Sequence, residues 1–222
     1  MSENYRIFDK LDKNIDGDVY TDELWLYMLS TDGSIFRKKP ACVVYPKNSK
    51  DVIRTVNFAH KYGMTIHPRG SGSGLCGSAL GGGIVLDFTK YMNRLIRIDT
   101  KDKSFECQPG YRFGQLAAEL TDKHLFFPPD PSSGEYASFG GMYGTNASGA
   151  HSVKYGNVSD YVLDAEIVLS DGQVITLSDI ERRDYADLPE NLQMLSRIYT
   201  KNVKKIVSAV DDRAGVQLTW LF

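Results

Sequence analysis

A dense run of glycines after a short apolar segment constrains this chain more than any other feature. Met64 to His67 are expected to form a strand that ends at Pro68, and the next nine residues, Arg69 to Gly77, contain four glycines. Three more follow at Gly81–Gly83. Three consecutive glycines cost roughly 3 kcal/mol relative to alanine inside a helix. The sequence therefore predicts an irregular loop here, followed by another strand.

Gly72 to Gly77 match the G-x-G-x-x-G pattern of Rossmann dinucleotide sites. That fold requires a helix that starts at the last glycine and points its N-terminus at the pyrophosphate. The glycines at 81–83 exclude such a helix. A Walker-type phosphate loop is excluded too, because no Gly-Lys-Ser/Thr ends the run.

The remaining interpretation is a loop whose backbone N–H groups turn toward an anion without a helix behind them. Ser71, Ser73 and Ser78 would add hydroxyl donors. Arg69 would either offset part of the anion's charge or anchor the end of the strand. The alternative is an ordinary surface loop, which reflects the general turn preferences of glycine and serine.

A second segment with little side-chain bulk runs from Pro128 to Gly149 and includes Gly140-Gly141 and Gly144. Ser138, Thr145 and Asn146 offer short hydrogen-bonding side chains there. Two segments that both permit close backbone approach favour one extended ligand with a diphosphate at its middle and a polar ring at one end. FAD fits that description.

The rest of the pattern is α+β. Strands are expected at 41–45, 84–88, 95–99 and 104–107, helices at 49–63, 113–120 and 188–210, and a hairpin at 162–177 turned by Ser170-Asp171-Gly172. Asn48 or Ser49 is expected to cap the first helix. The predicted division is a lead-in at 1–40, a ligand-binding domain of two subdomains at 41–180, and a C-terminal helix and tail at 181–222.

Composition narrows the function classes. A net charge of −2, with Lys and Arg spread along the chain, argues against a nucleic-acid surface. No apolar run is long enough to cross a bilayer, so an integral membrane segment is not expected. The N-terminus lacks the features of a signal peptide, so a cytoplasmic location is expected. Three cysteines without a C-x-x-C pair give no zinc or iron–sulfur site within the chain.

Two further motifs are weaker. Asp12 to Glu23 match the calcium-loop pattern, with glycine at the sixth position and glutamate at the twelfth, but no partner hand occurs, and a solvated acidic segment without calcium is the preferred interpretation. No metal site is predicted.

Among the four histidines, His151 follows the second glycine segment and is the one retained as a candidate flavin neighbour. No catalytic base is assigned.

Five groups of residues together resemble a known family. They are Val43-Val44-Tyr45-Pro46 with Asp51-Val52, Pro68 to Ala79, Pro128 to Ser133, Gly140-Gly141 with Thr145 to Gly149, and Lys154-Tyr155-Gly156 with Asp171-Gly172. They resemble the FAD-binding domain of the vanillyl-alcohol oxidase (PCMH) type, in particular that of FAD-linked D-lactate dehydrogenases and glycolate oxidase flavin subunits. Each group is a weak signal alone, and the combination is specific.

The resemblance implies two α+β subdomains that hold an extended FAD, with its pyrophosphate on the Arg69–Gly77 amides. The residues expected to bind the cofactor are Arg69, Gly70, Ser71, Gly72, Ser73, Gly74, Ser78, Pro129, Asp130, Ser138, Gly141, Thr145, Asn146, Gly149, Ile167 and Val168. Some relatives attach FAD covalently through a histidine at the place of Ser73, so a noncovalent flavin is expected here.

The resemblance also implies a function, the flavin-dependent oxidation of a 2-hydroxy acid such as D-lactate or glycolate. Family members continue with a substrate-binding domain, which is expected to be missing from this chain or supplied by another subunit. An electron-transfer partner and peripheral attachment to the inner membrane are further expectations. The alternatives are the flavin module of another oxidoreductase (MurB-like, or a sugar or alcohol oxidase), a non-catalytic flavin-binding subunit, and a calcium-responsive protein.

Overall fold

The computed structural model describes residues 6–178 and 185–209, which form two compact units. The first unit comprises residues 6–162 and 168–174 of the described chain. The second comprises residues 163–167, 175–178 and 185–209.

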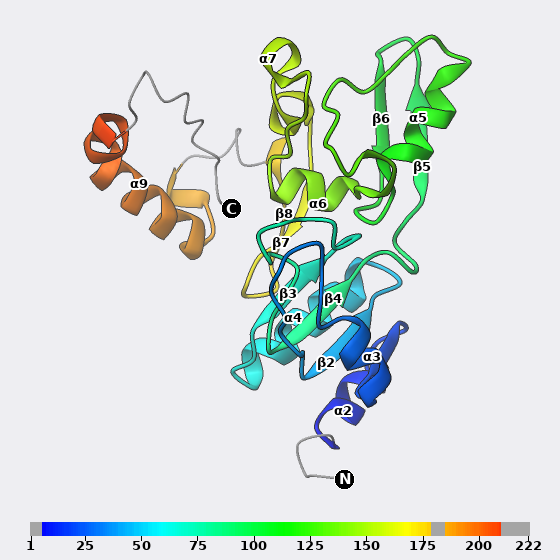
Figure 1. The fold of residues 1–222 in the computed structure, drawn as a ribbon. Helices are drawn as coiled ribbons and strands as arrows, with labels where there is room; N and C mark the ends of the chain where they lie inside the picture. Colours follow the sequence, from blue (N-terminus) through cyan, green and yellow to red (C-terminus); the bar gives the residue numbers. More distant parts are fainter. Residues whose placement is uncertain (1–5, 179–184, 210–222) are drawn as a thin grey trace. The chain divides into compact units, whose positions relative to one another are not determined.

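The first unit is built on a four-stranded sheet (Figure 1). The strands are β1 (Asp18–Tyr20), β2 (Cys42–Tyr45), β3 (Ile66–Arg69) and β4 (Ile84–Asp87), in the order β1-β2-β4-β3. β2, β4 and β3 run parallel, whereas β1 pairs antiparallel with β2. Every residue of β2 and β4 is buried, as expected for parallel strands that are covered on both faces.

Alternate residues of β2 face different helices, as the two-residue repeat of a strand requires. Cys42 and Val44 share a core cluster with α2 (Phe8–Asp12) and α4 (Ser49–Lys61). Val43 and Tyr45 share another with α3 (Glu23–Met28). α4 begins after Asn48, whose side chain accepts a hydrogen bond from the Asp51 N–H. The predicted cap, strand and helix are thus confirmed.

The remainder of the first unit contains the antiparallel pair β5 (Leu95–Asp99) and β6 (Ser104–Cys107). It shares a core cluster with α5 (Phe113–Thr121), α6 (Phe139–Gly144) and the 3-10 helix η2 (Val158–Tyr161). The same part of the chain contains α7 (Ser152–Tyr155) and the 3-10 helix η1 (Gly134–Tyr136). The rings of Phe105, Phe127 and Phe139 meet edge to face at centroid distances of 5.0 to 5.7 Å. This aromatic cluster gives the second subdomain its own core.

A two-stranded sheet is formed by β7 (Glu166–Val168) and β8 (Val174–Thr176), the predicted hairpin. Its turn contains Gly172 at φ +82°. The second unit continues with η3 (Tyr185–Asp187) and α9 (Glu190–Ala209), the predicted C-terminal helix.

Two segments differ from the expected pattern. The segment expected as a lead-in contributes β1 to the main sheet, and its Phe8, Leu11 and Ile15 are buried in the main core. The second glycine-rich segment, for which no helix was predicted, forms the short helix α6 despite three glycines. It does so because Phe139 and Met142 are buried in the second core, and tertiary packing outweighs low helix propensity.

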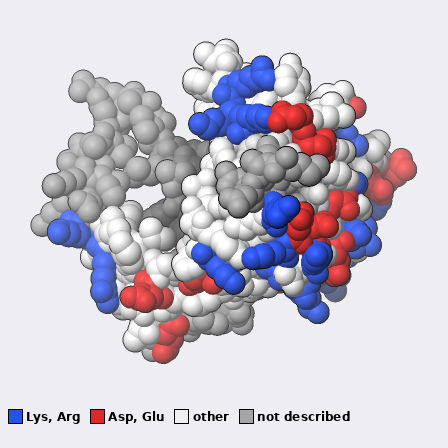
Figure 2. All heavy atoms as spheres, turned by 90° about the horizontal axis from the view of Figure 1, so that it is seen from below, with Lys and Arg blue, Asp and Glu red and all other residues white. Residues whose placement is uncertain are grey.

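Basic and acidic side chains are interspersed on the face of the molecule in Figure 2, which offers no continuous field of one sign. None of the helices in the described part of the chain combines the length and apolar character needed to cross a membrane.

Candidate cofactor-binding site

The first glycine-rich loop leaves the sheet at the carboxyl end of β3, next to the carboxyl end of β4. In open parallel sheets, ligands bind at this edge. Gly72 and Gly77 have φ values of +67° and +72°, a left-handed conformation that L-residues rarely adopt. The loop therefore needs glycine at both positions.

The backbone N–H groups of this loop are free. Between Ser71 and Ser78, none donates to an acceptor within the part of the chain that the structure describes. The residues of this loop are half-buried or exposed, so its N–H groups are accessible to a ligand. A row of free amides on a loop with little side-chain bulk is the arrangement that binds a phosphate or diphosphate.

The segment from Thr31 to Arg37 holds the other side of the loop. The Gly33 N–H donates to the Gly72 carbonyl at 2.7 Å. A Cβ on Gly77 would lie 3.0 Å from the Phe36 ring. These contacts fix the carbonyl side of the loop, which leaves its N–H groups available to a ligand.

The start of α6 meets the loop. Ser138 is 3% exposed, and its Oγ has no hydrogen-bond partner among the described residues. A Cβ on Gly70 would overlap this hydroxyl and would lie 3.8 Å from the Gly141 nitrogen. The Gly141 N–H, too, has no acceptor in the described ranges. The structure thus brings Gly70 of the first loop together with Ser138 and Gly141, which the family resemblance places at the ribityl and isoalloxazine part of FAD.

Arg69 lies beneath the loop. Its Nε is 3.8 Å from Oδ2 of Asp87, and the two side chains are only 10% and 6% exposed. A Cβ on Gly72 would come within 2.5 Å of its Nη2. Asp87 also accepts from the Thr89 N–H and hydroxyl, and burial raises the pKa of its carboxyl. Of the two roles expected for Arg69, the geometry favours anchoring the strand end; its buried Nη1 has no partner among the described residues.

The expected residues of the second segment form a separate group around Asp130. Pro129 is fully buried, and a Cβ on Gly149 would overlap the Asp130 carbonyl. The Asp130 carboxylate accepts from the His151 N–H at 3.2 Å and lies 2.5 Å from the His151 ring Nδ1. The hydrogen bond from the His151 ring holds the pKa of Asp130 below its usual value.

The other expected residues are engaged elsewhere or lie apart. The Thr145 hydroxyl donates to the Gly141 carbonyl within α6, and Asn146, at φ +44°, accepts from the Ser159 N–H. Val168 packs against the main core. Ile167 belongs to the second unit. A Cβ on Gly74 would make only an ordinary contact, 3.5 Å from the Ser78 hydroxyl.

A cavity of about 510 Å³ adjoins the loop, and sequence reasoning found only part of its wall. Ser71 and Ser73 were expected to contact a ligand, whereas Thr89, Asn93, Arg112 and Gln115 were not. Position in the fold, after β4 and at the start of α5, brings these four side chains to the cavity. These residues could have been found in the sequence from their positions, because they lie just after the strand expected at 84–88 or near the start of the helix expected at 113–120.

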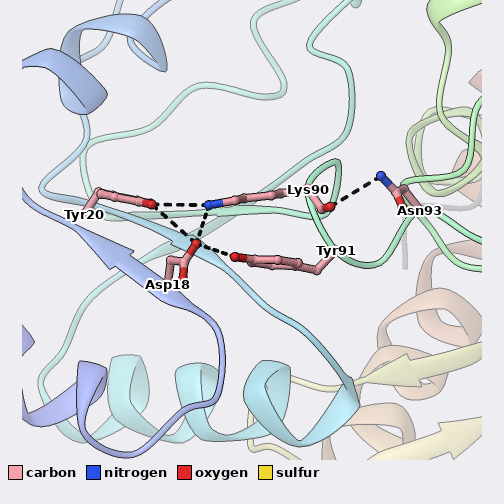
Figure 3. A network of polar contacts seen from close by, with 5 residues as sticks. All are labelled: Asp18, Tyr20, Lys90, Tyr91 and Asn93. Atoms are coloured by element: carbon pink, nitrogen blue, oxygen red, sulfur yellow. Dashed lines mark hydrogen bonds and ion pairs between the residues drawn. The ribbon is translucent and has the colours of Figure 1, made fainter.

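A polar network fixes the turn that carries Thr89 and Asn93 (Figure 3). Lys90 pairs with the Asp18 carboxylate and lies 3.3 Å from the Tyr20 hydroxyl, while the Tyr91 hydroxyl donates to Asp18 at 2.8 Å. Burial acts to raise the pKa of Asp18, but the Lys90 and Tyr91 donors outweigh it, so the pKa lies below its ordinary 3.8. β1 is thus tied to the turn after β4.

The calcium-like motif is occupied by other contacts. Glu23 pairs with Lys39 at 2.5 Å, and a Cβ on Gly17 would overlap the Tyr45 carbonyl of β2. Gly17 is not among the residues with positive φ, although calcium loops make a sharp turn at that glycine. No group of three or more metal-ligating side chains occurs among the residues that the structure describes. That the segment binds no calcium stays a prediction.

Comparison with known proteins decides the family. The model of the FAD-binding domain matches residues 40–178, more than half of the chain. The chain belongs to the FAD-binding domain family. This confirms the family, the α+β fold and the cofactor expected from the sequence, and the free amides, the missing Cβ of Gly70 and the orphaned Ser138 hydroxyl fit a bound diphosphate.

Relatives and solved structures agree with this family. The chain is 29% identical over 217 residues to a D-2-hydroxyglutarate dehydrogenase of Haemophilus influenzae, covering 92% of this chain and 21% of that protein. It is 35% identical over 153 residues to glycolate oxidase subunit GlcD of Bacillus subtilis, covering 68% and 32%. The structure of 6-hydroxy-D-nicotine oxidase from Arthrobacter nicotinovorans matches with a TM-score of 0.66 at 30% identity, covering 76% and 37%. The chain thus spans about a fifth to a third of the two relatives' length.

Proposed function

We propose that this chain is the FAD-binding part of an oxidoreductase that oxidises 2-hydroxy acids such as D-lactate or glycolate. The observation that carries the proposal is the row of N–H groups from Ser71 to Ser78 and the Ser138 hydroxyl next to Gly70, none of which has a hydrogen-bond partner within residues 6–178 and 185–209. The substrate class is supported by the names of the relatives, which include D-2-hydroxyglutarate dehydrogenase, glycolate oxidase and D-lactate dehydrogenase.

The geometry supports the proposed roles at the diphosphate, and the family resemblance supports those at the ribityl and ring end. The Ser71–Ser78 amides and the Gly141 N–H would bind the diphosphate, and Ser138 would donate its hydroxyl to the same group. Arg69 would support the loop from beneath and add positive charge close to it. Pro129, Asp130, Asn146, Gly149, Ile167 and Val168 are proposed for the ribityl and ring end. Bound FAD supplies the two-electron acceptor for hydride removal.

We propose that the flavin is held without a covalent bond. The residue four positions after Arg69 is Ser73, and a serine hydroxyl is a weaker nucleophile than the imidazole that carries the flavin in some relatives. Denatured protein should release its FAD quantitatively. The domain boundaries at residues 40 and 180, the cytoplasmic location, peripheral membrane attachment and an electron-transfer partner stay predictions.

Anaerobic reduction tests the function. The oxidoreductase that contains this domain, loaded with FAD, is mixed with D-lactate, glycolate or D-2-hydroxyglutarate, and the visible absorbance of the flavin is followed. Bleaching by at least one of these acids, with L-lactate as the stereochemical control, is the expected result. A flavin that is reduced by a sugar or a simple alcohol but by no 2-hydroxy acid would contradict the proposed substrate class while leaving FAD binding intact.

A further inference from the structure

The cavity of about 510 Å³ beside the first glycine-rich loop has a polar wall with a single kind of charge. Arg112, at the start of α5, contributes a guanidinium, and none of the residues of the wall is an aspartate or a glutamate. Hydroxyl and amide groups make up most of the remainder, from Ser71, Ser73, Thr89, Asn93, Gln115 and Tyr136. A cavity with one positive charge, many hydrogen-bond donors and no negative charge favours an anionic ligand.

The Arg112 guanidinium is oriented by its own helix but has no charge partner. Its Nε donates to Oε1 of Gln115 at 3.3 Å, and the same oxygen accepts from the Arg112 backbone N–H at 3.2 Å. Within residues 6–178 and 185–209, neither Nη1 nor Nη2 has an acceptor, and no carboxylate pairs with the side chain. The two terminal nitrogens are therefore available to the oxygens of a phosphate, which arginine binds in a bidentate manner.

The backbone places Arg112 next to Ser138. An isolated antiparallel bridge pairs the two residues, and hydrogen bonds of 2.8 and 2.9 Å join the neighbouring residues of the same two segments. Residues that lie directly opposite each other in an antiparallel pair have their side chains on the same face. Arg112 thus shares a face with the buried Ser138 hydroxyl, which has no partner among the described residues.

The first glycine-rich loop supplies backbone N–H groups but no positive charge of its own. No lysine or arginine occurs from Gly70 to Thr89. Arg69 lies beneath the loop, where the Asp87 carboxylate, 3.8 Å from its Nε, offsets its charge. The negative charge of a diphosphate on the loop would therefore need a further cation, and Arg112 is a cation that shares a cavity wall with the loop.

We propose that Arg112 binds the phosphate oxygens of the ligand held by the Ser71–Ser78 amides, and that it makes the site selective for a ligand with a diphosphate. The proposal rests on the proposed function, in which that ligand is FAD. Because Arg112 belongs to the second subdomain and the loop to the first, the phosphate oxygens join the two subdomains. The contribution of Arg112 is electrostatic and is weakened by salt, since its side chain is exposed.

The affinity for FAD is measured by equilibrium dialysis with apoprotein of the full chain. Arg112→Gln should weaken binding about tenfold, the effect of one hydrogen bond to a charged group. Arg112→Lys should bind more tightly than Arg112→Gln, because it retains the charge. Raising NaCl from about 0.05 to about 0.5 M should weaken binding more in wild type than in Arg112→Gln. Arg54→Gln, which removes an exposed arginine of α4 outside the cavity wall, is the control and should bind FAD like wild type.

Inorganic pyrophosphate shows which part of the ligand Arg112 contacts, because it carries the diphosphate without sugar or ring. Its dissociation constant, measured by calorimetry, should also rise about tenfold in Arg112→Gln and stay unchanged in Arg54→Gln. Equal affinities for pyrophosphate in the two variants would overturn the proposal, and so would a Lys variant that binds FAD no better than the Gln variant. Wild type that binds pyrophosphate through Arg112 but does not bind FAD would instead refute the proposed function and leave the role of Arg112 standing.

Discussion

The backbone of Gly70 lies so close to Ser138 that a methyl group on Gly70 would overlap the Ser138 hydroxyl. This contact joins the loop after β3 to the start of α6, across about seventy residues of sequence. It sets the distance between the two sets of free N–H groups. Gly70 is therefore the simplest position at which to test whether the Ser71–Ser78 loop and the start of α6 form one diphosphate site.

Gly70→Ala should destabilise the protein by about 1 to 3 kcal/mol, because a well-packed contact cannot admit an extra methyl group without a shift of backbone. FAD affinity should fall with it. Adding Ser138→Gly should restore the free energy of unfolding but not the affinity, since the hydroxyl donor is then absent. Gly144→Ala, where a Cβ meets nothing within 4 Å, is the control. Urea unfolding that is identical in Gly70→Ala and wild type would show that the two segments do not touch.

Gly72→Val should abolish FAD retention. Gly72 has φ +67° and lies on the Arg69 guanidinium, so a side chain there must change the loop's path. Gly63→Val is a matched control, because Gly63 has φ +63° with nothing within 4 Å of its missing Cβ. Both variants should lose about 1 to 2 kcal/mol to left-handed strain. Only Gly72→Val should lose FAD, as measured by flavin absorbance after gel filtration. Equal retention of FAD in the two variants would refute diphosphate binding by the Ser71–Ser78 amides.

Arg69→Met should destabilise the protein by about 3 to 5 kcal/mol, because it leaves the buried Asp87 carboxylate without its cation. The double variant with Asp87→Asn should recover part of that loss. Arg97 provides the surface control. It forms a salt bridge with Glu106, and the two side chains are 69% and 56% exposed. Arg97→Met should change the free energy of unfolding by less than about 1 kcal/mol. Equal effects of the two arginine variants would contradict the supporting role of Arg69.

Low pH should weaken the ion pair and hydrogen bonds by which Asp18 of β1 binds Lys90 and Tyr91 in the turn after β4. The pKa of Asp18 is depressed in the folded protein, so its contribution to stability is present above 3.8 and is lost as the pH falls through the lower, folded pKa. Asp18→Asn should therefore flatten the acid limb of a plot of the urea midpoint against pH. Tyr91→Phe, which removes one donor to Asp18, should flatten it less. An unchanged acid limb in Asp18→Asn would show that Lys90 and Tyr91 do not stabilise the ionised carboxylate.

The sequence predicted those features that local chemistry determines. The strands at Cys42–Tyr45 and Ile84–Asp87, the Asn48 cap and the exclusion of a helix after Gly77 follow from short apolar runs, one capping side chain and the cost of glycine in a helix. The glycine loop and the Ser138 region were predicted as parts of one site, and the structure brings Gly70, Ser138 and Gly141 together.

Features that depend on tertiary contacts were not predicted. α6 forms although three of its six residues are glycine, because Phe139 and Met142 find a core supplied by distant segments. The entry of Asp18–Tyr20 into the sheet depends on pairing with β2 and on Lys90, more than seventy positions away. His151 was retained as a candidate neighbour of the flavin, but its link to Asp130 joins residues 21 apart on an irregular segment. No periodicity could reveal such contacts.

An absorption spectrum of the purified protein, before and after denaturation, tests the central claim most directly. The account predicts a yellow protein with the two visible bands of an oxidised flavin, and a supernatant that contains FAD at one equivalent per chain after acid precipitation. Colourless protein that takes up no FAD on reconstitution would contradict the account.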